Sequence, residues 1–313
     1  MIQSLIFIVI GVAMVLWGAD RLTEGASALA RRLRVPEIVI GLTIVAAGTS
    51  APELFVSLVS ALKDTPDMAV GNVVGSNIFN TLLIVGCSAM VAPMVISAST
   101  VKKDIPFAVG ASMLLLGAIL MGSDISRLDG LVLLAGFALF MVYTFRVAMQ
   151  KPADGGETAV AQKPAGVWLN LLYVVAGLAG LVLGSNLFVE SASDVARQLD
   201  VSEGVIGLTI VAGGTSLPEL ATSVVAARKG QSAIAIGNVI GSNVFNILLI
   251  LGLTATISPM AVQGITVVDL TVMLVSVLVV WGFAYTKYTV ARWEGAVLTA
   301  GFLAYMGWLM YNL

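Results

Sequence analysis

Apolar segments of about 20 residues, separated by short polar connections, follow one another along the whole chain. A segment of this length crosses ~30 Å of hydrocarbon as an α-helix. Only 11% of the 313 residues are charged, whereas roughly 25% are charged in a typical soluble domain. The pattern therefore predicts an all-α polytopic membrane protein with ten transmembrane helices, near residues 2–22, 36–62, 68–92, 105–122, 128–148, 167–187, 202–227, 233–257, 266–286 and 294–312.

The positive charges in the connections predict how the chain is oriented. Twelve Lys and Arg residues follow odd-numbered spans and only three follow even-numbered ones. Because short cytoplasmic loops are enriched in Lys and Arg, both termini are expected outside the cytoplasm. Asp20 and Glu24 lie beside Arg21 near the predicted cytoplasmic end of the first span, where a solvated helix end is expected.

A second pattern is an internal repeat with a constant offset of 166 residues. "GTSAPEL" at 48–54 matches "GTSLPEL" at 214–220, and "GNVVGSNIFN" at 71–80 matches "GNVIGSNVFN" at 237–246. A constant offset without gaps indicates an internal duplication. The spacing of the two glycines in the longer motif also fits close helix packing.

The duplication predicts two five-helix units. They comprise residues 1–150 and 167–313, joined by a short, polar cytoplasmic linker at 151–166. Because five is odd, the second unit enters the membrane from the opposite face. Inverted repeats of this kind place a binding site near the midplane of the membrane.

Glu53 and Glu219 occupy equivalent positions in the middle of predicted spans 2 and 7. A carboxylate at a helix centre costs ~2.5–3.5 kcal/mol on insertion scales, so an intramembrane glutamate indicates a functional site. Pro52 and Pro218 each remove a backbone donor, which frees a carbonyl about one turn earlier. Helices 2 and 7 are therefore expected to be broken, at 48–49 and 214–215. Freed carbonyls at such breaks present partial negative charge to cations.

The longer motif adds polar side chains, each of which offers an oxygen atom: Asn72, Ser76, Asn77 and Asn80 with Asn238, Ser242, Asn243 and Asn246. The chain has no histidine, and its single cysteine, Cys87, excludes an internal disulfide and a thiolate cluster. Oxygen ligands alone suit Ca²⁺ and Na⁺. Two carboxylates ~5 Å apart repel by ~3 kcal/mol at an effective dielectric of about 20, so a divalent cation, several Na⁺ or protons must occupy the site.

The duplicated motifs resemble the two alpha-repeats of the calcium/cation antiporter superfamily, and within it the chain looks like a prokaryotic sodium/calcium exchanger. The resemblance implies that Glu53 and Glu219 are the central Ca²⁺ ligands, assisted by the carbonyls of Thr49 and Thr215. It implies that Na⁺ uses the same glutamates with Ser50, Ser76, Ser216 and Ser242 and the carbonyls of Ala46 and Ala212. Asn80 matches the first-repeat amide of the family. At 246 the potassium-dependent branch carries Asp, whereas this chain has Asn, which argues against potassium co-transport.

A protein of this kind is an antiporter and no enzyme. The resemblance implies Na⁺/Ca²⁺ exchange by alternating access in the cell (inner) membrane, with the lipid bilayer as surroundings and without cofactor, nucleic acid or obligatory protein partner. An alternative is an exchanger of the same fold coupled to protons or magnesium, although proton-coupled relatives often use a histidine, which this chain lacks. An intramembrane protease would need a His or Lys base beside its serine. A channel is not expected, because an enclosed site between inverted repeats favours alternating access.

Overall fold

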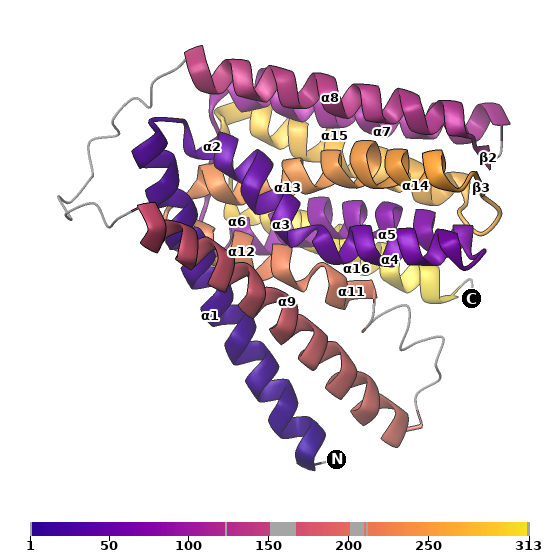
Figure 1. Ribbon diagram of the computed structural model, residues 1–313, viewed down its shortest axis with the longest axis horizontal. Helices are drawn as coiled ribbons and strands as arrows, with labels where there is room; N and C mark the ends of the chain where they lie inside the picture. The colour runs from indigo at the N-terminus through magenta and orange to yellow at the C-terminus, as the bar shows by residue number, and fades with distance from the viewer. Residues whose placement is uncertain (1, 123, 151–166, 201–209, 211, 312–313) are drawn as a thin grey trace.

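The computed structural model describes residues 2–122, 124–150, 167–200, 210 and 212–311, and Figure 1 shows their arrangement. Within these ranges, seven helices are long and apolar enough to cross a membrane, judged by length and composition. The number rises to eight if a bent pair, Glu37–Thr49 with Ala51–Leu62, counts as one span. The chain is thus an all-helical polytopic bundle, apart from two short β-ribbons.

The described elements form two series, one on each side of the linker. Before it lie α1 (Ile2–Leu33), α2 (Glu37–Ile40), η1 (Gly41–Val45), α3 (Ala46–Thr49), α4 (Ala51–Leu62), α5 (Pro66–Ile78), η2 (Phe79–Ile84), α6 (Val85–Val91), β1 (Met94–Val95), η3 (Thr100–Asp104), α7 (Ile105–Gly122), β2 (Asp124–Ile125) and α8 (Arg127–Gln150). After it lie α9 (Val167–Gln198), α11 (Ala212–Thr215), α12 (Leu217–Arg228), α13 (Ser232–Val244), η5 (Phe245–Leu251), α14 (Gly252–Ile257), β3 (Met260–Ala261), α15 (Val267–Lys287), β4 (Thr289–Val290) and α16 (Arg292–Tyr311). The η elements are π-helical turns.

Most of the predicted spans coincide with these helices, with three differences. The helices α1 and α9 continue beyond the predicted ends at 22 and 187, because small residues extend their packed faces after the apolar segment ends. The predicted span 294–312 is the helix α16, whose first three residues include Arg292 and Glu294; this helix is not among the seven. The predicted span 202–227 lies partly outside the described residues, and its described part is α11 with α12.

Two antiparallel ribbons of two-residue strands accompany the predicted helices. The strand β1 pairs with β4, Met94 facing Val290, and β2 pairs with β3, Asp124 facing Ala261. Strands of two residues carry no alternating pattern in the sequence, so nothing predicted them. Each ribbon joins a connection before the linker to a connection after it.

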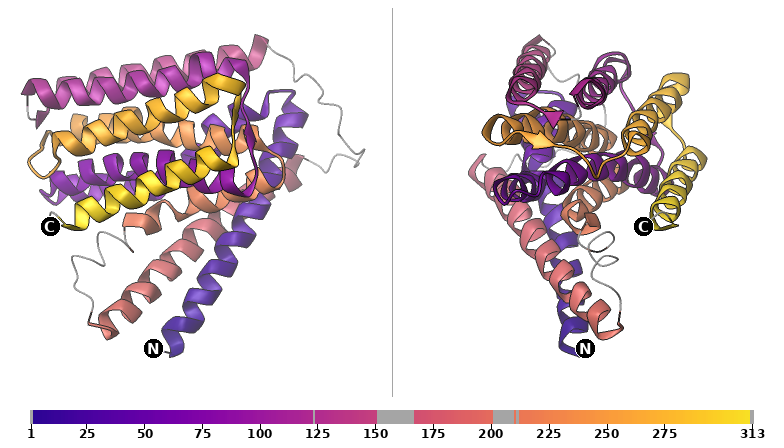
Figure 2. Two further views of the ribbon diagram at one scale, coloured as in Figure 1. Left: turned by 180° about the vertical axis from the view of Figure 1, so that it is seen from behind. Right: turned by 90° about the vertical axis from the view of Figure 1, so that its right-hand side faces the viewer.

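The long helices α1 and α9 cross each other and project from one side of the bundle, as Figure 1 and both views of Figure 2 show. Their crossing depends on glycine. A Cβ atom on Gly18 would lie 2.7 Å from the Gly177 carbonyl oxygen, and one on Gly177 would lie 2.6 Å from the Leu22 nitrogen. Because both neighbours are backbone atoms, a side chain at either position would push the helices apart.

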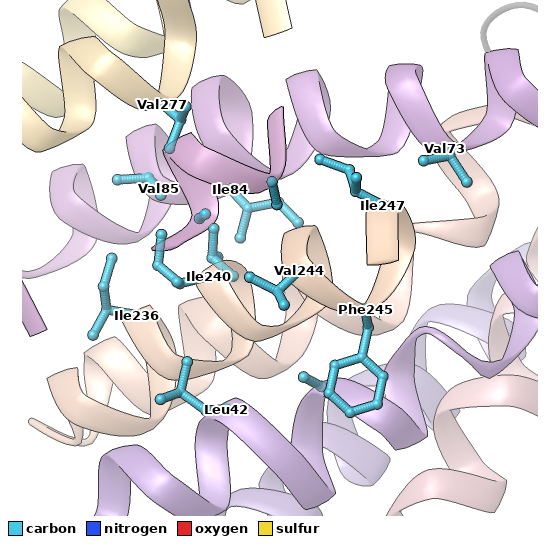
Figure 3. Close-up of a cluster of buried hydrophobic side chains, with 14 of the residues drawn as sticks. Leu42, Val73, Ile84, Val85, Ile236, Ile240, Val244, Phe245, Ile247 and Val277 are labelled. Atoms are coloured by element: carbon cyan, nitrogen blue, oxygen red, sulfur yellow. The ribbon is translucent and has the colours of Figure 1, made fainter. Parts of the chain in front are cut away.

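The helix α13 lies at the centre of the bundle. Every one of its residues from 234 to 244 is buried, as is typical of a helix surrounded on all sides by protein. In Figure 3 its side chains Ile236, Ile240 and Val244 pack beside Leu42 of η1 and Ile84 of η2. The second copy of the longer repeat motif therefore lies in the middle of the core.

The glycines of that motif confirm close packing in α13. A Cβ atom on Gly237 would lie 3.0 Å from the Gly41 Cα atom, and one on Gly241 would lie 2.7 Å from the Ala46 Cβ atom. The two glycines therefore bring η1 and α3 directly against α13, and the backbone around Ala46 lies next to the second copy of the longer motif.

The helix interruptions lie slightly later than predicted. The segments 37–49 and 51–62 meet at Ser50 with a bend of 46°, and Ser216 separates α11 from α12. The interruption lies at the serines because Pro52 and Pro218 occupy the first turn of the following helix, where a missing N–H breaks no helical hydrogen bond. The predicted positions, 48–49 and 214–215, are off by one or two residues.

Candidate ion-binding site

Two buried glutamates lie where the interrupted helices meet. Glu53 is in the first turn of α4 and Glu219 in the first turn of α12, and each is only 1% exposed. The hydroxyl of Ser216 donates to Glu53 Oε1 over 3.1 Å, and the hydroxyl of Ser50 donates to Glu219 Oε1 over 3.0 Å. Each serine therefore holds the glutamate of the other half of the chain, and the two carboxylates lie close enough to repel each other.

Further hydroxyls surround the two carboxylates. The Ser216 hydroxyl also contacts the Ser76 hydroxyl at 3.2 Å, which brings α5 to the site. Ser242 is buried on α13 beside Glu219, and Thr215 lies beside Glu53. These contacts gather side chains from five helices, α4, α5, α11, α12 and α13, around one pair of charges.

The backbone that carries the glutamates is clamped by two equivalent asparagines. The Asn72 amide donates to the Glu53 carbonyl over 3.2 Å, and the Asn238 amide donates to the Glu219 carbonyl over 3.3 Å. The Thr49 hydroxyl lies 3.1 Å from Asn238 Oδ1. Both asparagines are thus used to hold protein groups, whereas the sequence suggested them as possible ligands.

Two other asparagines present oxygen atoms that accept no hydrogen bond from the described residues. Asn80 donates its amide to Asn243 Oδ1 over 3.1 Å, and Asn246 donates its amide to Asn77 Oδ1 over 3.0 Å. Their own Oδ1 atoms are buried and have no hydrogen-bond partner among the described residues. Asn80 and Asn246 lie in the π-helical turns η2 and η5, a local geometry that is frequent at functional sites. Of these, η2 packs against α12 and η5 against α4.

The site is consequently rich in unpaired acceptors. The Oε2 atoms of Glu53 and Glu219 are also buried without a donor in the described part of the chain. No Lys or Arg forms an ion pair with either glutamate within the described ranges. A buried acceptor without a donor costs ~1–3 kcal/mol, and more when it is charged. Four such oxygens around two carboxylates match the ligands that a hard cation prefers.

The structure brings most of the predicted site residues together. Those joined by side-chain hydrogen bonds or by burial next to the glutamates are Thr49, Ser50, Glu53, Ser76, Thr215, Ser216, Glu219 and Ser242. Asn80 and Asn246 lie in η2 and η5, which pack against the helices α12 and α4 that carry the glutamates. Ala46 is buried, and its carbonyl accepts the Ser50 N–H at 2.9 Å. Ala212 is helical, and its side chain lies outside the described part of the chain.

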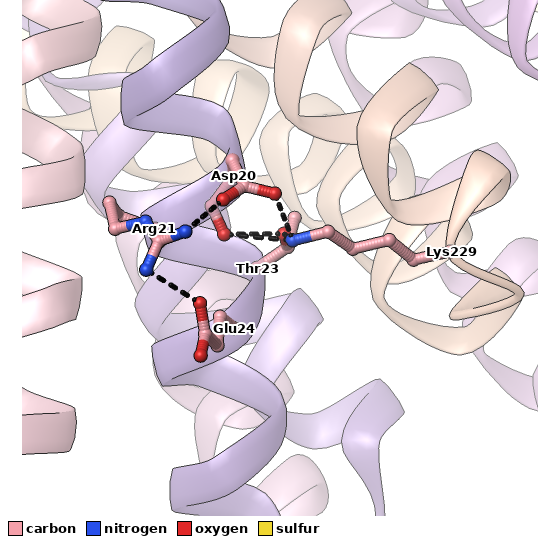
Figure 4. A network of polar contacts seen from close by, with 5 residues as sticks. All are labelled: Asp20, Arg21, Thr23, Glu24 and Lys229. Atoms are coloured by element: carbon pink, nitrogen blue, oxygen red, sulfur yellow. Dashed lines mark hydrogen bonds and ion pairs between the residues drawn. The ribbon is translucent and has the colours of Figure 1, made fainter.

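A charged cluster lies apart from this site, on α1. Lys229 pairs with Asp20 at 2.6 Å and donates to the Thr23 hydroxyl at 3.0 Å, while Arg21 pairs with Asp20 and, at 2.9 Å, with Glu24 (Figure 4). The four charged side chains of the cluster are between 29% and 49% exposed. The expected helix end at this point is wrong, since α1 continues to Leu33, and the charges tie α1 to the end of α12 instead.

Comparisons with known proteins show which family and fold this chain resembles. The model of the family described as "Sodium/calcium exchanger protein" matches residues 3–146 and 169–311. The putative antiporter CaxA of Alkalimonas amylolytica is 40% identical over 264 residues, which cover 83% of this chain and 82% of the relative. The sodium/calcium exchanger MaX1 of Methanosarcina acetivorans is 34% identical, covering 98% and 99%. A solved structure of the sodium-calcium exchanger NCX_Mj, soaked with 2.5 mM Na⁺ and 0.1 mM Ca²⁺, superimposes with a TM-score of 0.84 at 30% identity, covering 98% of both chains.

Proposed function

Because this chain belongs to the sodium/calcium exchanger protein family of membrane cation antiporters, we propose that it exchanges Na⁺ for Ca²⁺ by alternating access around the site between Glu53 and Glu219. The family and the structural likeness support antiport of Ca²⁺ against another cation. The identity of the coupling ion, the ligand set and the alternating access are the parts that we propose.

The observation that carries the proposal is a set of four buried oxygens, two from carboxylates and two from amides, that have no donor in the part of the chain that the structure describes. Ca²⁺ takes 6–8 oxygen ligands at ~2.3–2.6 Å, so these four supply part of its shell. We assign the carbonyls of Thr49 and Thr215 to complete it.

Sodium takes an overlapping set of ligands in this proposal. The set comprises the two glutamates, the hydroxyls of Ser50, Ser76, Ser216 and Ser242, the carbonyls of Ala46 and Ala212, and the amide oxygens of Asn80 and Asn246. Ser50 and Ser216 would have to turn from donors to ligands, because a hydroxyl bound to Na⁺ offers its lone pair to the ion. One pair of carboxylates cannot hold both kinds of ion with full charge compensation at once. Competition for this pair is what couples the two fluxes.

We further propose that the chain consists of ten spans in two inverted repeats, 1–150 and 167–313, with 151–166 as a cytoplasmic linker and both termini outside. The support is that contacts recur after the 166-residue shift. The bond from Ser216 to Glu53 has its counterpart in the bond from Ser50 to Glu219, and the asparagine clamps recur likewise. A pair of such repeats surrounds a site near the membrane midplane, which each face of the membrane reaches in turn.

Calcium flux in proteoliposomes tests the proposal. Protein is reconstituted into vesicles loaded with Na⁺, and ⁴⁵Ca²⁺ uptake is measured after dilution into Na⁺-free buffer, with a parallel set driven by a pH gradient at equal Na⁺. We expect uptake in the first set and none above empty vesicles in the second. Uptake driven only by the pH gradient would instead establish proton coupling, and no Ca²⁺ uptake in either set would refute the assignment of Ca²⁺.

A further inference from the structure

We propose that Thr81 and Asn243 form a hydrogen-bond relay that fixes the amide of Asn80 with its oxygen toward the ion site. Thr81 and Asn243 are then positioning residues: neither needs to touch the ion. The inference rests on the proposed function, since it assigns Asn80 Oδ1 as a cation ligand. All three side chains are at most 4% exposed.

The relay begins at the hydroxyl of Thr81. This hydroxyl lies 2.6 Å from the carbonyl oxygen of Asn77, one turn earlier. A carbonyl has no proton to give, so the hydroxyl must donate its single hydrogen here. Toward any other group Thr81 Oγ1 is left as an acceptor.

The direction of the next two bonds follows from that one. Asn243 contacts Thr81 Oγ1 at 2.9 Å, and it must present its NH₂ group because the hydroxyl only accepts. The Oδ1 atom of Asn243 then faces Asn80, whose own NH₂ group must donate to it, and the Nδ2–Oδ1 distance is 3.1 Å. Asn80 Oδ1 is left on the opposite side of the amide, buried and without a donor.

The second half of the chain has no hydroxyl at the position equivalent to Thr81. Position 247, which corresponds to Thr81 after the 166-residue shift, is a buried isoleucine. There the amide of Asn77, which orients Asn246, is held by longer contacts: 3.4 Å to the Asn243 carbonyl and 3.9 Å to the Met273 sulfur. The two halves therefore hold their site amides by different means, and only Asn80 is fixed by a hydroxyl.

Orientation matters because the two ends of an amide act oppositely on a cation. The oxygen attracts the ion, whereas the NH₂ group carries partial positive charge toward it. Without the Thr81 hydroxyl, Asn243 and Asn80 are free to turn together and still bond each other, since each amide has both a donor and an acceptor. The relay removes this second arrangement.

Three variants test the relay by calorimetric titration of Ca²⁺ into the purified protein. Thr81→Val keeps the shape and removes the hydroxyl, and we expect about tenfold weaker binding, as is usual when a group that orients a ligand is lost. Thr81→Ser restores the hydroxyl and should bind within about twofold of the native chain. The matched control is Thr43→Val, because Thr43 makes the same 2.6 Å bond to the carbonyl one turn earlier, in the π-helical turn η1.

Two further measurements separate positioning from a structural role. In an Asn80→Ala background, Thr81→Val should not weaken Ca²⁺ binding any further, because the ligand that the Thr81 hydroxyl orients is already gone. Conversely, Ile247→Thr adds the missing hydroxyl to the second half without removing a bond of Thr81. We expect it to tighten Ca²⁺ binding by about 2–10-fold, the value of one neutral hydrogen bond.

Several outcomes would overturn the relay: equal affinities of Thr81→Val and Thr43→Val, additive losses with Asn80→Ala, or unchanged affinity in Ile247→Thr. Ile247→Thr tests the relay even if Thr81→Val does not fold. Failure of the proposed function is distinguishable, because the native chain would then bind no Ca²⁺ or show no Na⁺-driven flux. Loss of Na⁺ coupling alone leaves the calorimetric comparison intact.

Discussion

Replacing Glu219 by glutamine tests how the charge of the site acts on its two ions. Glu219 is 1% exposed, accepts the Ser50 hydroxyl at one oxygen and has no donor at the other. Glutamine has nearly the same shape, so the change removes one negative charge and preserves the packing. The other carboxylate, Glu53, keeps its serine donor.

The size of the effect follows from the charges. A unit charge about 3 Å from Ca²⁺ contributes about 11 kcal/mol at an effective dielectric of about 20, and half of that for Na⁺, because the attraction is proportional to the ionic charge. Relaxation of protein and water reduces both values and leaves their ratio near two. If about 4 kcal/mol of the Ca²⁺ attraction survives, Ca²⁺ binding weakens about 1,000-fold and binding of each Na⁺ about 30-fold.

Calorimetric titration of each ion separately, in detergent, measures both losses. The control is Glu190→Gln, which removes a glutamate charge from an exposed position on α9 and should change neither affinity. Equal losses for Ca²⁺ and Na⁺ would refute the electrostatic reasoning. Calcium flux of Glu219→Gln close to that of the native chain would remove this residue from the site altogether.

Three further predictions concern orientation, the serine bonds and the helix crossing. Single cysteines at Lys63 and Arg228 should react with a membrane-impermeant maleimide from outside and from the cytoplasm, respectively; labelling from one face would contradict inverted repeats. Ser216→Ala removes the donor to a buried carboxylate, worth ~1.5–3 kcal/mol, so the ion-free protein should melt earlier, and saturating Ca²⁺ should shrink the difference. An equal difference with and without Ca²⁺ would count against a cation at this carboxylate. Gly18→Val should lower the free energy of unfolding by about 1–3 kcal/mol, whereas Gly301→Val should leave it unchanged, since no described atom lies within 4 Å of a Cβ placed there. Thermal unfolding in detergent compares the two variants, and equal melting temperatures would contradict the packing argument.

The two glutamates and the interrupted helices could be predicted from the sequence for a physical reason. A buried carboxylate and a proline are both costly within an apolar span, so their presence at Glu53 and Pro52, and again 166 residues later, indicates a use. The residues at which the spans end could not all be predicted in this way. The helix α1 extends to Leu33 because packing against α9, rather than hydropathy, determines where it ends.

The bonds that cross between the halves could not be predicted. Nothing in the sequence near Ser50 shows that its hydroxyl binds Glu219 and leaves Glu53 to Ser216, since this depends on how the two interruptions meet in space. The role of Thr81 was also missed. A threonine in an apolar helix usually bonds its own backbone, as Thr81 does, and its second bond to Asn243 arises only from the fold.

Both β-ribbons join a segment made early in synthesis to a segment made late. Met94 finds its partner Val290 only when nearly the whole chain has left the ribosome, and α1 remains without its crossing helix until α9 is made. Glu53 likewise enters the membrane before Ser216, its hydroxyl donor, has been synthesised. Until the second half is made, the face of the first half that will pack against it must be covered by the insertion machinery or by lipid. A chain cut short before β4 leaves β1 unpaired, so synthesis of β4, between α15 and α16, is the step at which a newly made molecule becomes distinguishable from one truncated earlier.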